Sequence, residues 1–338
     1  MSDRVGVGVI GAGRMGSFHA QTVARRLPDA SLSAVADPLP GAAHRVADAV
    51  GATAYTDAQS LIDDHRVTAV VIASTASVHA DLVIAAAGAG KPVFCEKPMA
   101  LTLADADRAL DAVRYAGVQL QVGFNRRFAA DFAAARDAVS TGGIGRPQLL
   151  RSLTRDPGLA NPGAVKPWTI FRETLIHDFD ALRWLNRGAE PVEVYAIADA
   201  LIAPDFKDAG LLDTSVAVIR FDNGAMGTAE ASFAAAYGYD VRAEVFGSDG
   251  MVQAGHHEAT AMRHFTAAGV QAATVRRDVE LFADAYTAEM AHFVECVRTG
   301  ATPSVTGADA RGALAIALAC IRSVERRRPV QMTELEQR

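Results

Sequence analysis

The sequence predicts an α/β protein with two domains. An N-terminal Rossmann dinucleotide-binding domain is expected over residues 1–123, and a C-terminal α+β domain with a large, mostly antiparallel open sheet over residues 124–338. The chain has 338 residues, which is more than one hydrophobic core usually holds. In its first third, short β-branched runs alternate with amphipathic segments, a pattern typical of a parallel sheet covered by helices. Beyond residue 124, consecutive alternating runs are joined by short turns, which favours antiparallel pairing.

The first domain is expected to alternate strands with helices. Strands are predicted at 5–10, 32–36, 69–73, 93–95 and 120–122. Helices are predicted at 15–26, 42–50, 57–62, 79–87 and 103–115. Parallel strands connected in this way present their carboxyl ends at one edge of the sheet, where open α/β sheets bind ligands.

The second domain is expected to be a sheet backed by helices on one side. Helices are predicted at 129–139, 171–185, 282–298 and 308–326, and strands at 148–153, 192–198, 215–221, 225–233 and 241–246, with a loop at 156–167. Helices on one side leave the other face of the sheet to be buried. We therefore expect a homo-oligomer, a dimer or a homotetramer, assembled through this C-terminal sheet.

Composition narrows the possible partners and compartment. The net charge of -6 argues against a nucleic-acid partner, which needs clustered cations. The basic run Arg326–Arg328 is interpreted as a solvated helix end. Three cysteines without CxxC spacing indicate neither a disulfide framework nor a zinc cage. No export signal and no apolar run of about 20 residues is visible, so we expect a cytoplasmic protein with no membrane partner.

A glycine motif directly follows the first predicted strand. Gly11, Gly13 and Gly16 form a GxGxxG that also opens a helix, the context in which this pattern is informative. The first glycine permits a tight turn, the second lets the backbone approach a pyrophosphate, and the third lets helix and strand pack closely. The helix N-terminus adds free N–H groups for the pyrophosphate. The alternative is a flexible glycine turn without a ligand.

Asp37 ends the second predicted strand, about 20 residues beyond the glycines. At this position a carboxylate accepts hydrogen bonds from both ribose hydroxyls of the adenosine half and repels a 2′-phosphate. Because Pro38 follows and no Arg or Lys comes immediately after, the sequence favours NAD over NADP as the cofactor.

Two further segments carry side chains suited to acid–base chemistry. Lys97 leaves the carboxyl end of the strand at 93–95. Glu173, His177 and Asp180 stand at i, i+4 and i+7 of a predicted helix, so one face would carry acid, imidazole and acid. By itself, each signal has a simpler explanation, because lysines after strands and charges on helix faces are usually solvated.

The ExxxH spacing of Glu173 and His177 also fits a two-ligand metal site. No obvious third and fourth ligands accompany it, since His256–His257 looks like a turn. We therefore expect no metal.

Taken together, the motifs resemble the glucose-fructose oxidoreductase / inositol dehydrogenase / MocA family, and within it the inositol 2-dehydrogenases. The resemblance spans residues 8 to 329. It is carried by the GxGxxG, Ser74-Thr75 to His79, Glu96-Lys97-Pro98, Gly123-Phe124-Asn125-Arg126-Arg127-Phe128, Arg155-Asp156-Pro157, His177-Asp178-Phe179-Asp180 and Tyr237-Gly238-Tyr239-Asp240.

The resemblance implies NAD-dependent oxidation of a hydroxyl of a small polyol, such as an inositol, to a ketone. Lys97 corresponds to the family's catalytic lysine, in a Lys-Pro bond that is often cis, and His177 to its acid/base histidine. Glu173 would orient this pair. The implied substrate-binding residues are Arg127, Asp156, Asp180 and Tyr237. The implied cofactor-binding residues are Gly11, Gly13, Arg14, Met15, Gly16, Asp37, Ser74, Thr75, His79, Glu96 and Lys97, with Thr75, His79 and Glu96 along the nicotinamide half.

Two departures from the family pattern leave the substrate open. Glu173 stands where inositol dehydrogenases usually carry Asp, and Trp168-Thr169 replaces a familiar Gly-Gly. Within the same chemistry, an aldose or amino-sugar dehydrogenase is the alternative. Other classes are a non-catalytic NAD-binding protein, which would need neither Lys97 nor His177, and an NAD-assisted lyase or glycosidase, which would form no net NADH.

Overall fold

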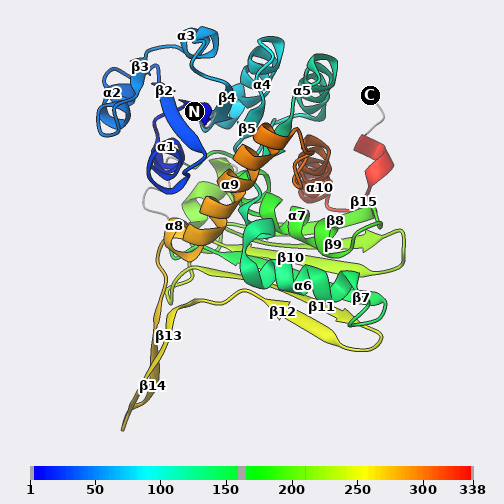
Figure 1. The fold of residues 1–338 in the computed structure, drawn as a ribbon. Coiled ribbons are helices and arrows are strands. Elements are labelled where there is room, and N and C mark those ends of the chain that lie inside the picture. The colour runs from blue at the N-terminus through cyan, green and yellow to red at the C-terminus, as the bar shows by residue number, and fades with distance from the viewer. Residues whose placement is uncertain (1–3, 159–164, 210, 336–338) are drawn as a thin grey trace. The chain divides into compact units, whose positions relative to one another are not determined.

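The computed structural model describes residues 4–158, 165–209 and 211–335, and these form two compact units (Figure 1). The first unit comprises 1–125 and 284–311, and the second 126–283 and 312–338. The segment 284–311 thus packs with the first unit, although it was expected in the second domain. Part of the predicted loop at 156–167, residues 159–164, lies outside the described residues.

The first unit contains a six-stranded parallel sheet in the order β3-β2-β1-β4-β5-β6. Its strands are β1 (Val5–Ile10), β2 (Ala30–Ala36), β3 (Thr53–Tyr55), β4 (Ala69–Ile72), β5 (Val93–Cys95) and β6 (Leu120–Val122). This is the Rossmann order, so the predicted fold is confirmed. The strand β3 was not predicted, because three half-buried residues at a sheet edge give no periodicity.

The helices of this sheet are α1 (Arg14–Arg26), α2 (Ala42–Ala47), α3 (Ala58–Asp63), α4 (His79–Gly88) and α5 (Leu103–Ala116). Two begin at side-chain caps, where Asp57 accepts from the backbone N–H of Ser60 at 2.8 Å and Thr102 from that of Asp105 at 3.1 Å. The predicted helix at 57–62 started one residue early because Asp57 is the cap. Gly117, with a φ of 67°, ends α5 in the left-handed conformation that favours glycine.

Helix α9 (Ala283–Thr299) belongs to the core of the first unit. Its buried Met290, Phe293 and Val294 join one hydrophobic cluster with Val7 and Val9 of β1 and with α1. The sequence shows this helix's amphipathic character but not which sheet it covers, because both units offer an apolar face.

The second unit is built on a seven-stranded sheet in the order β12-β11-β7-β10-β9-β8-β15. Its strands are β7 (Pro147–Arg155), β8 (Pro191–Asp199), β9 (Thr214–Phe221), β10 (Met226–Ser232), β11 (Asp240–Gly247), β12 (Met251–Ala254) and β15 (Val330–Gln331). The β7–β10 pair is parallel and the other pairs are antiparallel, which confirms the expected mostly antiparallel sheet. The short strands β12 and β15 were not predicted.

Helices α6 (Ala130–Ser140), α7 (Ile176–Leu185) and the second-unit part of α10 (Gly307–Arg326) accompany this sheet. Leu182 of α7 lies against Gly227 of β10, and Ser323 of α10 accepts from the N–H of Ala196 of β8 at 3.0 Å. Side chains of the opposite face stay exposed, as Val216 at 45% and Val218 at 44% show. The sheet is therefore open on one side, as expected.

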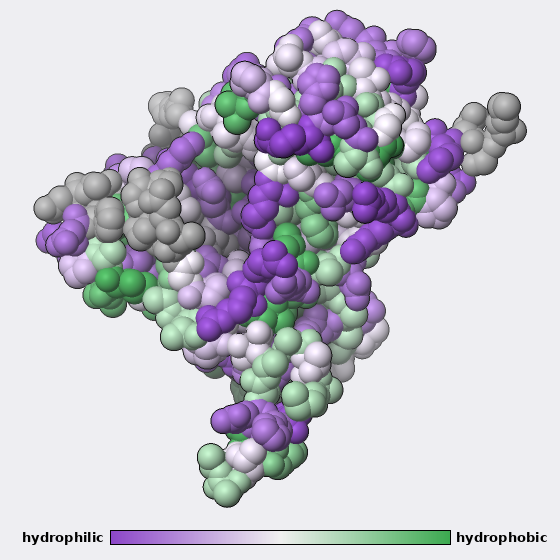
Figure 2. All heavy atoms as spheres, turned by 90° about the vertical axis from the view of Figure 1, so that its left-hand side faces the viewer, coloured by the Kyte–Doolittle hydropathy of each residue, from purple (hydrophilic) through white to green (hydrophobic). Residues whose placement is uncertain are grey.

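A two-stranded hairpin of β13 (Glu258–Thr266) and β14 (Gly269–Thr274) extends from the second unit (Figure 1). Figure 2 shows apolar and polar side chains mixed along it, and Met262, Phe265 and Val270 are 58%, 73% and 57% exposed. The hairpin was not predicted, because its exposed strands lack alternation. Short α8 (Asp278–Leu281) follows it. In the described ranges, no helix has an apolar stretch long enough to cross a membrane.

Candidate active site

The residues predicted to bind a dinucleotide lie at the carboxyl edge of the first sheet. Backbone bonds join Ala73 N–H to the Ile10 carbonyl at 2.8 Å, and Glu96 N–H to the Ile72 carbonyl at 2.9 Å. Gly11, Ala73 and Glu96 therefore each directly follow one of the adjacent strands β1, β4 and β5, at the same edge of the sheet. The edge includes the β1–β4 switch point, where doubly wound sheets bind their ligands.

The three motif glycines occupy positions that match their expected roles. Gly11 has a φ of 100°, and a Cβ there would lie 2.5 Å from the Ala73 carbonyl oxygen. A Cβ on Gly16 would lie 1.8 Å from the Gly11 carbonyl oxygen, so only glycine permits this close packing. Within the part of the chain that the structure describes, Gly13 has open space where a Cβ would be, and no side chain caps the N-terminus of α1 beside it. This surface fits a pyrophosphate approaching the backbone.

Asp37 is tied to the glycine turn. Its carboxylate accepts from the backbone N–H of Ala12 at 2.7 Å and from that of Leu39 at 2.8 Å. These bonds fix the carboxylate beside the turn. Arg14 on the same turn is exposed and Met15 half-buried.

His79 is buried and joins the loops after β4 and β5. Its Nε2 lies 3.0 Å from the Ser74 carbonyl oxygen and its Nδ1 2.9 Å from the Pro98 carbonyl oxygen. Expected along the nicotinamide half, His79 contacts the Ser74 carbonyl after β4 and the carbonyl of Pro98, the residue after Lys97. The neighbouring Thr75 hydroxyl lies 3.4 Å from that of Ser77.

Lys97 follows β5 in a cis Lys97–Pro98 peptide, as the resemblance implies. Its backbone N–H donates to Glu96 Oε2 at 3.3 Å. The other Glu96 oxygen lies 2.7 Å from His19 Nε2, inside the unit. Burial raises the pKa of Glu96, but the bond to His19 and the charges of His19, Lys97 and His79 outweigh it, so this pKa is lowered. His19 was not predicted as a site residue.

The second unit brings Arg127 and Asp180 together. Arg127 belongs to η2 (Asn125–Phe128), and its Nε and Nη2 donate to the two Asp180 carboxylate oxygens at 2.8 and 2.5 Å. Both side chains are buried, at 7% and 2% exposure, and the guanidinium lies 5.7 Å from the centre of the Trp184 ring. Both were expected to hold substrate hydroxyls, and they bind each other.

A second buried ion pair joins Arg126, the residue before Arg127, to Asp178. Arg126 Nη1 donates to Asp178 at 2.7 Å, and the hydroxyls of Ser152 and Thr154 donate to the same carboxylate at 2.5 and 2.6 Å. No role was predicted for this group. It fixes α7 to β7, and a sequence signal existed, since an acid among the buried residues of a helix needs a partner.

The helix expected to carry Glu173, His177 and Asp180 on one face is not regular. Residues Ile170–Thr174 form a π-helical turn, with the Leu175 N–H bonded to the Ile170 carbonyl at 2.9 Å, and α7 begins only at Ile176. The prediction of a regular α-helix is wrong over Ile170–Thr174, because a π turn contains an extra residue and breaks the 3.6-residue phase. That Glu173 shares a face with His177 and Asp180 stays a prediction. His177 and Asp180 keep the α-helical i, i+3 relation. His177 and Glu173 are both half-buried.

Trp168 precedes this turn with a φ of 65°, in the left-handed region that favours glycine. The departure noted in the sequence therefore places a bulky residue at a glycine-like backbone position. The Trp168 ring stacks on Phe171, with ring centres 6.4 Å apart.

Asp156 and Tyr237 lie near the carboxyl ends of β7 and β10. The backbone N–H and carbonyl of Asp156 bond to Ser232 and Ala235. The Tyr237 hydroxyl donates to Asp240 at 2.6 Å. Burial and the nearby Asp156 raise the pKa of Tyr239, a residue for which no role was predicted.

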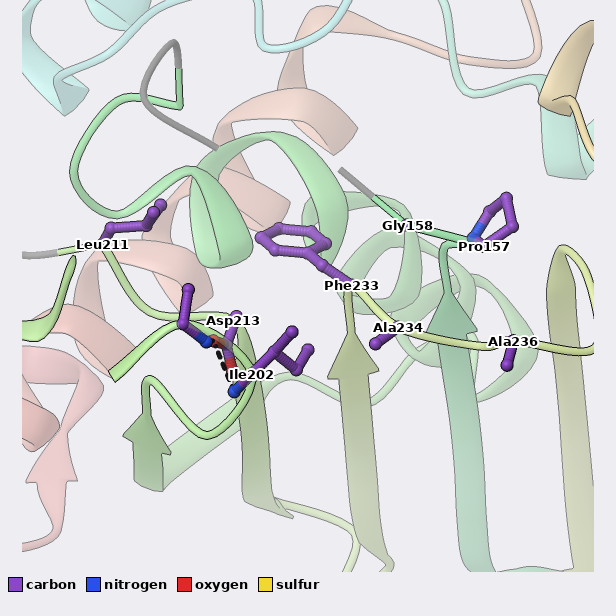
Figure 3. A pocket seen from close by; sticks show the side chains of 9 residues that line it. Pro157, Gly158, Ile202, Leu211, Asp213, Phe233, Ala234 and Ala236 are labelled. Atoms are coloured by element: carbon purple, nitrogen blue, oxygen red, sulfur yellow. Dashed lines mark hydrogen bonds between the residues drawn. The ribbon is translucent and has the colours of Figure 1, made fainter. Parts of the chain in front are cut away.

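A cavity of about 200 Å³ is lined by Pro157 and Gly158, which follow Asp156 in the sequence. Figure 3 shows the side chains around it. Phe233, Ile202 and Leu211 contribute apolar surface, and the Asp213 carboxylate accepts from the N–H of Ile202 at 2.9 Å. An inositol presents hydroxyls on every side and needs polar partners. This mainly apolar cavity does not match such a ligand.

Among the described residues, His19, Glu96 and Glu289 form a group whose nitrogen and carboxylate atoms lie within 4.8 Å of one another. The spacing of Glu173 and His177 does not contribute to it. Glu289, from α9, was not predicted as a site residue.

Comparison with known proteins gives matches along nearly the whole chain. Residues 5–124 match the model described as "Oxidoreductase family, NAD-binding Rossmann fold", and residues 136–332 the model "Oxidoreductase family, C-terminal alpha/beta domain". A myo-inositol 2-dehydrogenase of Thermotoga maritima is 38% identical, covering 97% of this chain and 99% of its own. A scyllo-inositol 2-dehydrogenase (NAD(+)) of Bacillus subtilis is 36% identical, over 98% and 97%.

A solved structure has the same fold. Scyllo-inositol dehydrogenase from Lactobacillus casei, crystallised with NAD(H) and scyllo-inositol, is 27% identical with a TM-score of 0.94, covering 98% of this chain and 99% of its own.

Proposed function

Because the chain belongs to the glucose-fructose oxidoreductase / inositol dehydrogenase / MocA family of oxidoreductases, we propose that it is an NAD-dependent inositol 2-dehydrogenase. It would oxidise one hydroxyl of a cyclitol, myo-inositol first among them, to the ketone. The observation that carries the proposal is the first-unit edge, where the glycine turn, Asp37 and Lys97 follow neighbouring parallel strands. The inositol-oxidising relatives, matched end to end, support the substrate class.

The residues of the edge suit NAD. Gly13 and the uncapped N-terminus of α1 would hold the pyrophosphate, and the fixed Asp37 carboxylate the adenosine ribose. When bound, NAD supplies the hydride acceptor. The absence of a cation directly after Asp37 supports NAD over NADP.

We propose that His177 accepts the proton of the reacting hydroxyl, because an imidazole titrates near neutral pH. The Lys97 ammonium donates to the same oxygen and stabilises the negative charge that grows on it. Glu173 orients this pair. Arg127, Asp156, Asp180 and Tyr237 bind the remaining hydroxyls, for which the Arg127–Asp180 pair presents acceptors and donors side by side.

The experiment is a panel of cyclitols and sugars screened for NADH formation by the purified protein. Turnover of myo-inositol or scyllo-inositol above aldoses supports the proposal. A preference for aldoses or amino sugars would favour a sugar dehydrogenase instead, an outcome for which Glu173 and the Trp168 backbone give a reason. NAD binding without NADH on any polyol would contradict an oxidoreductase role.

We also propose that the enzyme is a cytoplasmic homotetramer assembled through the open face of the second sheet. Large apolar side chains on this face include Tyr195 and Ile197 of β8, which pair with Val218 and Val216 of β9. They are 37%, 61%, 44% and 45% exposed. Such an area needs a partner. Changing both valines to lysine should yield a monomer by light scattering, and an unchanged mass would refute this interface. The three cysteines are free, in keeping with a reducing compartment.

A further inference from the structure

A cluster of buried polar side chains lies in the first unit and includes Glu96, the residue before Lys97. It consists of His19 from α1, Glu96 after β5, Gln121 from β6 and Glu289 from α9. Their exposed fractions are 0%, 7%, 0% and 0%. Two carboxyl groups and an imidazole therefore share one region of the core, with atoms within 4.8 Å of one another.

The two carboxyl groups have different surroundings. Glu96 accepts from the Lys97 backbone N–H at 3.3 Å and lies 2.7 Å from His19 Nε2. Gln121 Nε2 donates to the backbone carbonyl of Glu289, at 2.7 Å, and not to its carboxyl. Over the described ranges, neither carboxyl oxygen of Glu289 has a hydrogen-bond partner, and neither does His19 Nδ1.

This asymmetry decides where a proton is held. Two ionised carboxylates this close in a buried site repel each other, so such pairs keep a proton between them. An unpaired buried carboxylate is far costlier than a neutral acid. Glu96 has donors and Glu289 has none, so the proton belongs on Glu289. A neutral Glu289 also offers an O–H donor in this region, where His19 Nδ1 has no hydrogen-bond partner among the described residues.

The surrounding charges act in the same direction. Burial and the charge of Glu96 raise the pKa of Glu289. His19, Lys97 and His79 lower the pKa of Glu96 against the effect of burial. Burial and Glu96 raise the pKa of the Cys95 thiol, so that group stays neutral.

We propose that Glu96 and Glu289 share one proton, so that these two carboxyl groups carry a single negative charge next to Lys97. Glu289 is a positioning residue that becomes ionised if Glu96 is neutralised. The link to Lys97 rests on the proposed function. The shared proton does not, since it follows from the geometry of the first unit.

The first test is the pH dependence of the melting temperature of wild type and E289Q. A folded pKa above the unfolded value gives stability that is complete below the unfolded pKa, about 4.3, and is lost as pH rises toward the folded pKa. Glutamine does not titrate. The Tm of E289Q relative to wild type should therefore increase by about 2 °C for each pH unit between these values. The exposed Glu295 on the same helix supplies the control E295Q, expected to show no such trend. A flat difference for E289Q would overturn the proposal.

The second test needs no variant to fold. In wild-type protein labelled with ¹³C at the glutamate side-chain carboxyl, one signal should remain in the neutral position at pH 7. If all glutamate signals are ionised there, the proposal is wrong. Metal analysis of the same sample is a further check. A stoichiometric ion bound by His19, Glu96 and Glu289 would take the place of the shared proton and overturn the proposal.

The third test addresses catalysis. It measures the pH profile of kcat/KM for an inositol with NAD. E96Q and E289Q each leave one carboxyl able to carry the charge, whereas E96Q/E289Q leaves none. The kcat/KM of the double variant should be at least about tenfold lower than the product of the two single effects predicts, and the apparent pKa values of its pH profile should shift. Purely multiplicative effects would refute charge sharing. If K97M also retains turnover, the proposed role of Lys97 fails, while the stability and labelling tests still decide the shared proton.

Discussion

Arg127 and Asp180 form a buried bidentate ion pair, with guanidinium nitrogens 2.8 and 2.5 Å from the carboxylate oxygens. Removing one charge leaves the other buried without its partner, which typically costs about 3–5 kcal/mol. D180N should therefore lower the free energy of unfolding in urea by this amount. The exposed pair Arg114–Asp111 supplies the control D111N, expected to match wild type. Similar losses in both variants would mean that burial does not decide the effect.

The two glycines of the nucleotide turn should respond oppositely to alanine. A Cβ at position 16 would collide with the Gly11 carbonyl, so G16A should fold poorly, whereas position 13 has open space. G13A should keep the wild-type Tm but weaken NAD binding at least about tenfold, because its methyl occupies the pyrophosphate approach. Calorimetry measures both quantities. Wild-type NAD affinity in a folded G13A would remove Gly13 from the cofactor site.

Asp37 should set the preference between the two nicotinamide cofactors. In D37S/L39R, the carboxylate is lost and the exposed position 39 gains a cation suited to a 2′-phosphate. The ratio of kcat/KM for NAD to that for NADP should fall by at least about tenfold, roughly the 1.4 kcal/mol of one charged contact. D48S changes an exposed aspartate of the same unit and should leave the ratio unaltered.

Lys97 should be needed for turnover and not for cofactor binding. K97M keeps the apolar stem and removes the ammonium, so kcat should fall by at least about 100-fold, as when an oxyanion donor is lost. NAD titration should give a Kd within a few-fold of wild type. Lys207, which pairs with Asp199 on the surface, provides the control K207M. A near-normal rate in K97M would refute the assignment.

Glu173 should tune the substrate. E173D restores the residue usual in inositol dehydrogenases and retracts the carboxylate by one methylene. If the longer side chain is only a tuning change, kcat/KM for myo-inositol should rise. The exposed Glu190 allows E190D as a matched control. A lower rate in E173D would indicate that glutamate belongs to the site of a different substrate.

Local sequence patterns predicted the elements around the nucleotide site because the signals are short-range. The strand Val5–Ile10 and the glycine turn after it were assigned correctly, since β-branched periodicity and glycine spacing depend on neighbouring residues alone. At Ile170–Thr174 the same approach failed. A π turn depends on how Phe171 and Leu175 pack in the core, and a helical repeat carries no trace of it.

Periodicity and local motifs alone were enough to predict the Rossmann domain, the mostly antiparallel open sheet, the family, and the lysine and histidine on which the proposed chemistry depends. Three features appeared only in the folded chain: Arg127 binds Asp180, α9 joins the first core, and Glu289 lies near Glu96 and His19 with no partner for its carboxyl among the residues that the structure describes. The reason is physical. Burial and the distance between charges far apart in sequence set the cost of ionisation, and neither quantity exists until the chain has folded.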